Sequence, residues 1–144
     1  METFELHIWA PDRPFYDGVC ESLVLPTVDG QYGVMAHHSN AIAAVVPGEL
    51  GYTVPGEAKK YAAVGAGIVK IEDNTVHVLV ETAERPEEID VNRAEKDAEA
   101  AREALLQKQS RREYYTTKIS LARAMGRLRT REHSIGGDAP KERL

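Results

Sequence analysis

The sequence predicts an α+β protein of two domains, an N-terminal antiparallel β-sandwich followed by a C-terminal hairpin of two antiparallel helices. Through the first 80 residues apolar side chains alternate with polar ones, which is the period of a half-buried strand. After that point small apolar residues recur at steps of four and three, the period of a helix, at Ala94, Ala98, Ala101 and Leu105. We therefore place the sandwich at residues 1–86, the hairpin at 87–132 and a flexible tail at 133–144.

Turn residues divide the first domain into short strands. Phe4, Leu6 and Ile8 share one face of the first strand, and later candidates are residues 19–25, 33–35, 41–46, 50–54, 60–64, 67–71 and 75–80. Tight turns are predicted between them at Pro11-Asp12, Asp17-Gly18, Asp29-Gly30, Pro47-Gly48, Pro55-Gly56 and Asp73-Asn74. No segment between the strands is long enough for a crossover helix, so we expect no parallel sheet.

Two capping signals divide the second domain into two helices. The chain contains no Pro or Gly from residue 87 to residue 125, so local rules would allow a single helix. Asp90 can cap a first helix, which we place at 91–107. Ser110 and Glu113 form a capping box, in which each side chain accepts a backbone hydrogen bond, and this predicts a second helix at 111–131.

The seam between the two helices is expected to be rich in alanine. On the first helix we expect the face of Ala94, Ala98, Ala101 and Leu105, opposite Tyr115, Ile119, Ala122, Met125 and Leu128 on the second. Alanine side chains allow close approach but bury little surface, and burial stabilises by only about 25 cal/mol per Å². The sequence therefore predicts a hairpin that can open.

Charge is divided unequally along the chain. Residues 1–90 hold 15 acidic and 5 basic residues, a net charge of −10, whereas residues 91–144 hold 8 acidic and 13 basic residues, a net charge of +5. Eight basic residues and one acidic residue fall between Lys108 and Arg131. A basic helix of this kind indicates an anionic partner, either a phosphate group, a nucleic acid or an acidic protein surface, or else a solvated face.

Composition and motifs argue against several other classes of protein. The 144 residues are 42% hydrophobic, with no apolar run of membrane-spanning length and no N-terminal signal pattern, so we expect a soluble protein that stays where it is made. Cys20 is expected to be a packing residue. The pair His37-His38 lacks a third ligand for a metal, and no catalytic nucleophile and base can be assembled. Gly65-x-Gly67 lacks the rest of a dinucleotide fingerprint and is expected to mark close backbone packing. The sequence also has no glycine-rich phosphate loop with a lysine, so we expect no catalytic turnover of ATP.

Five segments, in order along nearly the whole chain, resemble one known family. They are residues 10–18 (APDRPFYDG), 30–38 (GQYGVMAHH), 64–71 (VGAGIVKI), the join at Glu84-Arg85 with 89–94 (IDVNRA), and 122–128 (ARAMGRL). Together they resemble the epsilon subunit of F-type ATP synthases.

The resemblance implies a non-catalytic rotor subunit of the proton-translocating synthase. It implies that the sandwich binds the gamma subunit and the c-ring, with Gln31 and His38 as contact residues, and that the basic second helix can reach the alpha and beta subunits and inhibit ATP hydrolysis. It also implies a peripheral position on the cytoplasmic face of a bacterial cell membrane. No cofactor is required, but ATP is a possible regulatory ligand, as in some members, through Glu84, Ile89, Asp90, Arg93, Ala94, Arg123 and Arg127.

The chain departs from the family pattern at four positions. Gln31 replaces an acidic residue, His37 replaces a glycine, Asn40 replaces a proline, and Ala100 stands where ATP-binding members can carry a further arginine, although Arg102 is near. These changes bear on the c-ring contact and on nucleotide affinity. The alternative function is a nucleic-acid-binding module that uses the basic helix, although the acidic first domain would repel a phosphate backbone.

Overall fold

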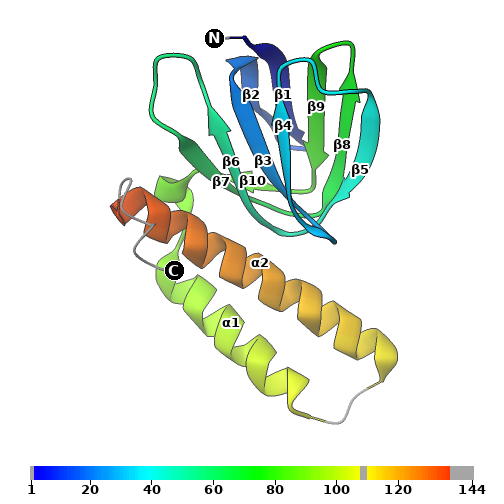
Figure 1. Ribbon diagram of the computed structural model, residues 1–144. Coiled ribbons are helices and arrows are strands. Elements are labelled where there is room, and N and C mark those ends of the chain that lie inside the picture. Colours follow the sequence, from blue (N-terminus) through cyan, green and yellow to red (C-terminus); the bar gives the residue numbers. More distant parts are fainter. Residues whose placement is uncertain (1, 108–109, 137–144) are drawn as a thin grey trace.

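The computed structural model describes residues 2–107 and 110–136, which form a sandwich of two five-stranded sheets and a pair of helices lying side by side against it (Figure 1). The strands are β1 (Phe4–Ala10), β2 (Arg13–Cys20), β3 (Ser22–Thr27), β4 (Gly30–Met35), β5 (Ala41–Val45), β6 (Gly48–Thr53), β7 (Lys60–Val64), β8 (Gly67–Glu72), β9 (Thr75–Val80) and β10 (Ala83–Glu84). A one-turn 3-10 helix, η1 (Pro86–Glu88), leads to α1 (Val91–Leu105) and α2 (Arg111–Gly136). The predicted fold class is confirmed.

One parallel pair of strands departs from the antiparallel prediction. The first sheet has the order β2-β1-β9-β8-β5 and the second β10-β7-β6-β3-β4. Strands β1 and β9 run parallel in the centre of the first sheet, whereas the other neighbouring pairs are antiparallel. The prediction rested on the lack of a crossover helix, but here the seven strands from β2 to β8 make up the connection between the two parallel strands.

Strand β2 was not predicted. The Pro11-Asp12 turn is present, but Asp17 and Gly18, which were predicted to form a turn, lie within β2 and pair with His7 and Leu6 of β1. The predicted strand at 19–25 is instead divided by a bend at Glu21 between β2 and β3. A long-range partner strand therefore overrides the local turn preference of an Asp-Gly pair.

The hydrophobic core lies between the two sheets and belongs to the sandwich alone. Its residues come from alternate positions along the strands, because successive side chains of a strand point to opposite faces. They include Phe4, Leu6, Ile8, Phe15, Cys20, Leu23, Leu25, Val34, Val45, Leu50, Val69, Ile71, Val76 and Val78. Cys20 is fully buried, which confirms its predicted packing role.

The capping residues begin both helices where the sequence predicted. The Asp90 carboxylate accepts a hydrogen bond from the Arg93 backbone N–H at 3.1 Å, and the Ser110 hydroxyl accepts one from the Glu113 backbone N–H at 3.2 Å. Helix α1 ends two residues before the predicted 107. Helix α2 continues to Gly136, so residues 133–136 belong to the helix and not to the predicted tail. Residues 137–144 lie outside the described part of the chain.

The seam between the helices matches the prediction on α1 and only in part on α2. Ala94, Ala98 and Ala101 are buried as predicted. On α2, however, Tyr115 and Ile119 are 58% and 43% exposed, so the prediction that they face α1 is wrong. The buried residues of α2 lie further along, at Ala124, Gly126 and Thr130, with Ala122, Met125 and Leu128 half-buried.

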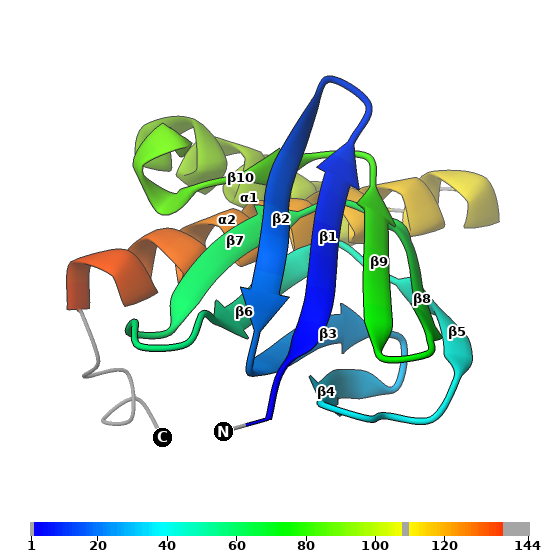
Figure 2. The same cartoon turned by 90° about the horizontal axis from the view of Figure 1, so that it is seen from above.

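The C-terminal half of α2 is buried on two sides, and this explains the difference. It packs against α1 and also against β6 and β7 of the second sheet, as the two views together show (Figure 2). Gly126 lies so close to the backbone of β6 that a Cβ atom placed on it would be 2.6 Å from the Cα of Gly48. A helix buried on two sides lacks the single apolar stripe on which the prediction depended.

No helix in the described residues is long and apolar enough to span a membrane.

Candidate functional site

The join between the domains is fixed to the sandwich by two arginines. Strand β10 pairs with β7, and η1 follows it at once. The Arg13 guanidinium binds both carboxylate oxygens of Glu88, at 2.9 and 2.7 Å. The Arg85 guanidinium lies 4.5 Å from the centre of the Phe15 ring and donates to the Phe15 carbonyl at 3.0 Å. These contacts set the point at which α1 leaves the sandwich.

The pairing with Arg13 has an electrostatic effect on Glu88. Hydrogen bonds from Arg13 and then from the Arg85 backbone N–H favour the charged carboxylate and lower the pKa of Glu88 to about 2. The carboxylate thus remains charged at neutral pH and acts as an anchor for η1.

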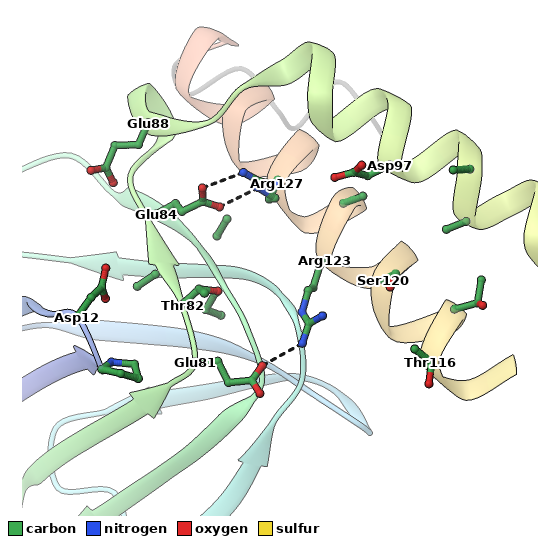
Figure 3. A pocket seen from close by; sticks show the side chains of 18 of the residues that line it. Asp12, Glu81, Thr82, Glu84, Glu88, Asp97, Thr116, Ser120, Arg123 and Arg127 are labelled. Atoms are coloured by element: carbon green, nitrogen blue, oxygen red, sulfur yellow. Dashed lines mark hydrogen bonds and ion pairs between the residues drawn. The ribbon is translucent and has the colours of Figure 1, made fainter. Parts of the chain in front are cut away.

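Two ion pairs connect α2 to the strand edge beside the join. Arg127 binds Glu84 through two parallel hydrogen bonds of 2.8 and 2.9 Å, and Arg123 binds Glu81 at 3.0 Å (Figure 3). The two arginines are four residues apart and therefore share one helix face. The Glu84–Arg127 pair is about three-quarters buried, whereas the Glu81–Arg123 pair is about half exposed.

These ion pairs border a pocket of about 1090 Å³ between the hairpin and the sandwich. Its polar lining combines carboxylates, guanidinium groups and hydroxyls from Asp12, Arg13, Glu81, Thr82, Glu84, Glu88, Asp97, Thr116, Thr117, Ser120, Arg123 and Arg127 (Figure 3). The volume is that of a pocket for a small molecule. Because carboxylates already bind Arg123 and Arg127, an anionic ligand would compete with Glu81 and Glu84 for these two guanidinium groups.

Only some of the predicted nucleotide-binding residues line this pocket. Glu84, Arg123 and Arg127 do, as does Ala100, the position at which other members can carry an arginine. Arg102 is not part of the lining, and its guanidinium binds the Met125 sulfur at 3.0 Å and Glu99 at 3.6 Å.

The other four predicted residues lie at the start of α1 and not in the pocket lining. Asp90 caps α1, while Ile89 and Ala94 are buried. Arg93 is exposed. The helical hairpin thus brings together the arginines of α2 and the glutamate of β10, but in this arrangement it leaves Arg93 outside their pocket.

The two residues predicted to contact other subunits lie on and after β4. Gln31 is exposed on β4. His38 is half-buried, lies 3.1 Å from the Tyr32 hydroxyl and contacts the carbonyl of Ser39 at 2.7 Å. Among the described residues, no group of three or more His, Cys, Asp or Glu is arranged to hold a metal ion.

Sequence reasoning missed the polar residues of α2 that line the pocket beside the arginines. Thr116, Ser120, Arg123 and Arg127 follow one another at steps of four, three and four. This is the spacing of one helix face, so the signal was present in the sequence. By contrast, no local pattern could have paired Arg13 with Glu88, which lies 75 residues away.

Comparison with known protein families accounts for both domains. Residues 3–86 match the family described as ATP synthase, Delta/Epsilon chain, beta-sandwich domain, and residues 87–132 match the long alpha-helix domain of the same chain. The chain belongs to the ATP synthase delta/epsilon family. As a member of this family it is a non-catalytic subunit, which confirms that prediction.

Relatives in the delta/epsilon family match almost end to end. The ATP synthase epsilon chain of Ruminiclostridium cellulolyticum is 42% identical over 128 residues, which cover 89% of this chain and 95% of the relative. That of Caldicellulosiruptor bescii is 34% identical, with coverage of 93% and 97%. A chain in the mitochondrial ATP synthase of Euglena gracilis, solved with OSCP, F1 and c-ring, shares the fold with a TM-score of 0.76 at 21% identity, covering 92% of this chain and 81% of that one.

Proposed function

We propose that this delta/epsilon-family chain is a rotor subunit of the central stalk in a proton-translocating ATP synthase, and that its helical hairpin regulates ATP hydrolysis. The observation that carries the proposal is that the main hydrophobic core lies within the sandwich. The hairpin contacts the sandwich through the close approach of Gly126 to Gly48 and through ion pairs such as Glu81–Arg123 and Glu84–Arg127. Such a hairpin can leave the sandwich without unfolding it. The complex would place the chain peripherally, on the cytoplasmic face of a bacterial cell membrane.

An apolar row on the sheet opposite the hairpin supports a contact with the gamma subunit. The strand register places five apolar residues side by side across all five strands of the first sheet: Pro14, Trp9, Leu79, Ile68 and Ala44. All five are exposed, and Trp9, Leu79 and Ile68 are each more than 40% exposed. A contiguous apolar surface of this kind favours burial against another protein. Gln31 and His38 remain our candidates for contacts with gamma or the c-ring.

The basic residues of α2 support the regulatory role. Arg112, Lys118 and Arg129 are exposed on the helix, while Arg123 and Arg127 are paired with carboxylates of the sandwich. If the hairpin extends, all five become available for an acidic surface of the alpha and beta subunits. The same pairing weakens the nucleic-acid alternative, because the folded hairpin withholds two of its cations from a phosphate backbone.

We further propose ATP as a regulatory ligand of the folded hairpin. The pocket has the necessary size, and Arg123 and Arg127 point into it from α2 (Figure 3). Since Glu81 and Glu84 hold these arginines already, ATP must compete with two carboxylates, so we expect weak affinity. No cofactor is needed for the structural role.

Hydrolysis by a reconstituted alpha–beta–gamma complex tests the inhibitory role. We expect the full chain to lower ATP hydrolysis and residues 1–86 to bind without lowering it, because the basic helix is missing. The double variant Arg112→Gln/Lys118→Gln, which removes two exposed cations of α2, should inhibit less than the parent.

Lys60→Gln is the matched control, because Lys60 is an exposed cation of the second sheet, not of the sheet that carries the apolar row, and its partner is Glu57. It should inhibit as the parent does. Equal hydrolysis with the full chain and with residues 1–86, measured at low ATP, would remove the regulatory role and leave the structural one.

A further inference from the structure

The last turns of α2 make a buried polar contact that the proposed function does not use. Nδ1 of His133 is hydrogen-bonded to Oε2 of Glu49 on β6. The Glu49 side chain is 8% exposed and the His133 side chain 15%. The ring of Tyr61 on β7 stacks on the imidazole, with ring centres 4.3 Å apart and planes at 28°. This contact joins the end of the helical domain to the outer face of the second sheet.

A buried carboxylate in this place is costly unless a proton or a cation accompanies it. Burial is the main cause that raises the pKa of Glu49, and the hydrogen bond and charge of His133 act in the opposite direction. The docked Glu49 carboxyl therefore keeps a proton to a higher pH than an exposed carboxyl does. When α2 leaves the sheet, Glu49 faces water and loses this environment.

Two cations in the described part of the chain also act on Glu49. Arg129 on α2 and Lys59 before β7 both lower the pKa of Glu49, though less than His133 does. The Lys59 ammonium lies 5.5 Å from the centre of the Tyr61 ring, and Arg131 donates to the Pro86 carbonyl at 3.2 Å. Arginine and lysine keep their charge between pH 5 and 9, so they do not supply a titration in that range.

We propose that Glu49, Tyr61 and His133 form an acid-strengthened latch, which holds the end of α2 on the sandwich and weakens as the pH rises. Because the pKa of Glu49 is raised when α2 is docked, the docked state keeps a proton on this carboxyl that the undocked state releases. Lowering the pH therefore favours docking, and the contribution is lost as Glu49 gives up its proton. The latch rests on the separable hairpin of the proposed function, but not on inhibition of hydrolysis or on ATP.

Spin labels on the full chain can measure docking directly. The labels are attached through the substitutions Asp29→Cys, in the turn after β3, and Arg112→Cys, at the start of α2. Both positions are exposed, whereas the native Cys20 is buried and out of reach of the label. Distance distributions from pH 5.5 to pH 8.5 give the ratio of docked to undocked molecules. We expect this ratio to fall about tenfold in the parent over this range, because the docked state gives up its proton.

Glu49→Gln tests the assignment, because it keeps a hydrogen-bonding side chain but cannot take up the proton. It should reduce the pH dependence to less than about twofold. His77→Gln is the matched control: His77 lies on the first sheet, stacked on His7, and its loss should leave the tenfold change intact. A parent ratio that does not change with pH, or a Glu49→Gln variant that keeps the full change, would overturn the latch.

Gly126→Ala shows whether a negative result contradicts only the latch or also the proposed function. A methyl group at this position would clash with the backbone of Gly48 and should raise the undocked fraction at every pH. If this variant shows only docked distances, the hairpin does not separate and both proposals fall. If it undocks while the parent and Glu49→Gln respond alike to pH, only the latch is wrong.

Discussion

At the scale of single residues, arginines define how the two domains meet. Arg13, Arg85, Arg123 and Arg127 each bind a carboxylate or a carbonyl of a different segment. An ion pair near the surface contributes about 0–1 kcal/mol, and removing one partner of a more buried pair costs more, because the other charge is left without a counterion. Arg127, with its two hydrogen bonds, should thus matter more than Arg123.

The nucleotide prediction belongs to this scale. In calorimetric titration of the full chain with ATP we expect a dissociation constant on the order of micromolar to millimolar. Arg127→Ala and Arg123→Ala should each weaken it, because both guanidinium groups reach the same anion only when the hairpin is folded. At 100 times the dissociation constant, ATP would stabilise the folded hairpin by about 2.7 kcal/mol.

Lys118→Ala is the control for this titration, since Lys118 is an exposed cation of the same helix that does not line the pocket. It should bind as the parent does. Absence of heat at millimolar ATP, or unchanged binding by both arginine variants, would show that the arginines serve only protein contacts.

At the scale of elements, the two halves of helix α2 have different surroundings. It begins exposed, with Tyr114, Tyr115 and Ile119 in contact with solvent, and it ends buried between α1 and the second sheet. The crossing with β6 depends on Gly126, because a Cβ atom at this position would lie 2.6 Å from the Cα of Gly48. Docking of the hairpin is thus a property of its C-terminal half.

Replacing Gly126 by alanine tests this crossing. In an exposed helix the change would stabilise by about 1 kcal/mol, but overpacking costs about 1–3 kcal/mol. We expect faster amide hydrogen exchange in α2 and unchanged exchange in the core strands. Gly33→Ala in β4, where an added Cβ meets no atom within 4 Å, should change neither. Slower exchange in α2 of the Gly126 variant would contradict the close crossing.

At the scale of the whole molecule, the main hydrophobic core lies between the two sheets of the sandwich. The main buried cluster runs from Phe4 to Ala83 and includes no residue of α1 or α2. The hairpin adds buried alanines and polar pairs, which stabilise less per residue than the larger side chains of the core. We therefore expect the hairpin to leave the sandwich more readily than the core strands leave one another.

We expect residues 1–86 to fold alone and to bind the gamma subunit. The core and all strands of both sheets are retained, and the surface of β6 and β7 that α2 covers is partly polar, with Glu49 and Tyr61 on it. Circular dichroism and cooperative urea unfolding test the first point, and co-elution with gamma tests the second. A truncated chain that is unfolded, or that is folded but does not co-elute, would contradict the separation of the domains.

Local patterns in the sequence were enough to predict most strands and the start of each helix. Alternation predicted most strands, Asp90 and Ser110 predicted both helix starts, and the spacing of Arg123 and Arg127 placed them on one face, because backbone geometry converts each of these patterns directly into structure. The long-range partners of these strands, helices and charged residues became known only from the tertiary structure. The parallel pairing of β1 with β9, the strand at Asp17-Gly18, the two-sided burial of α2 and the pairs Arg13–Glu88 and Glu49–His133 join residues far apart in the chain. Such contacts depend on packing and on the desolvation of charges, which no local pattern records.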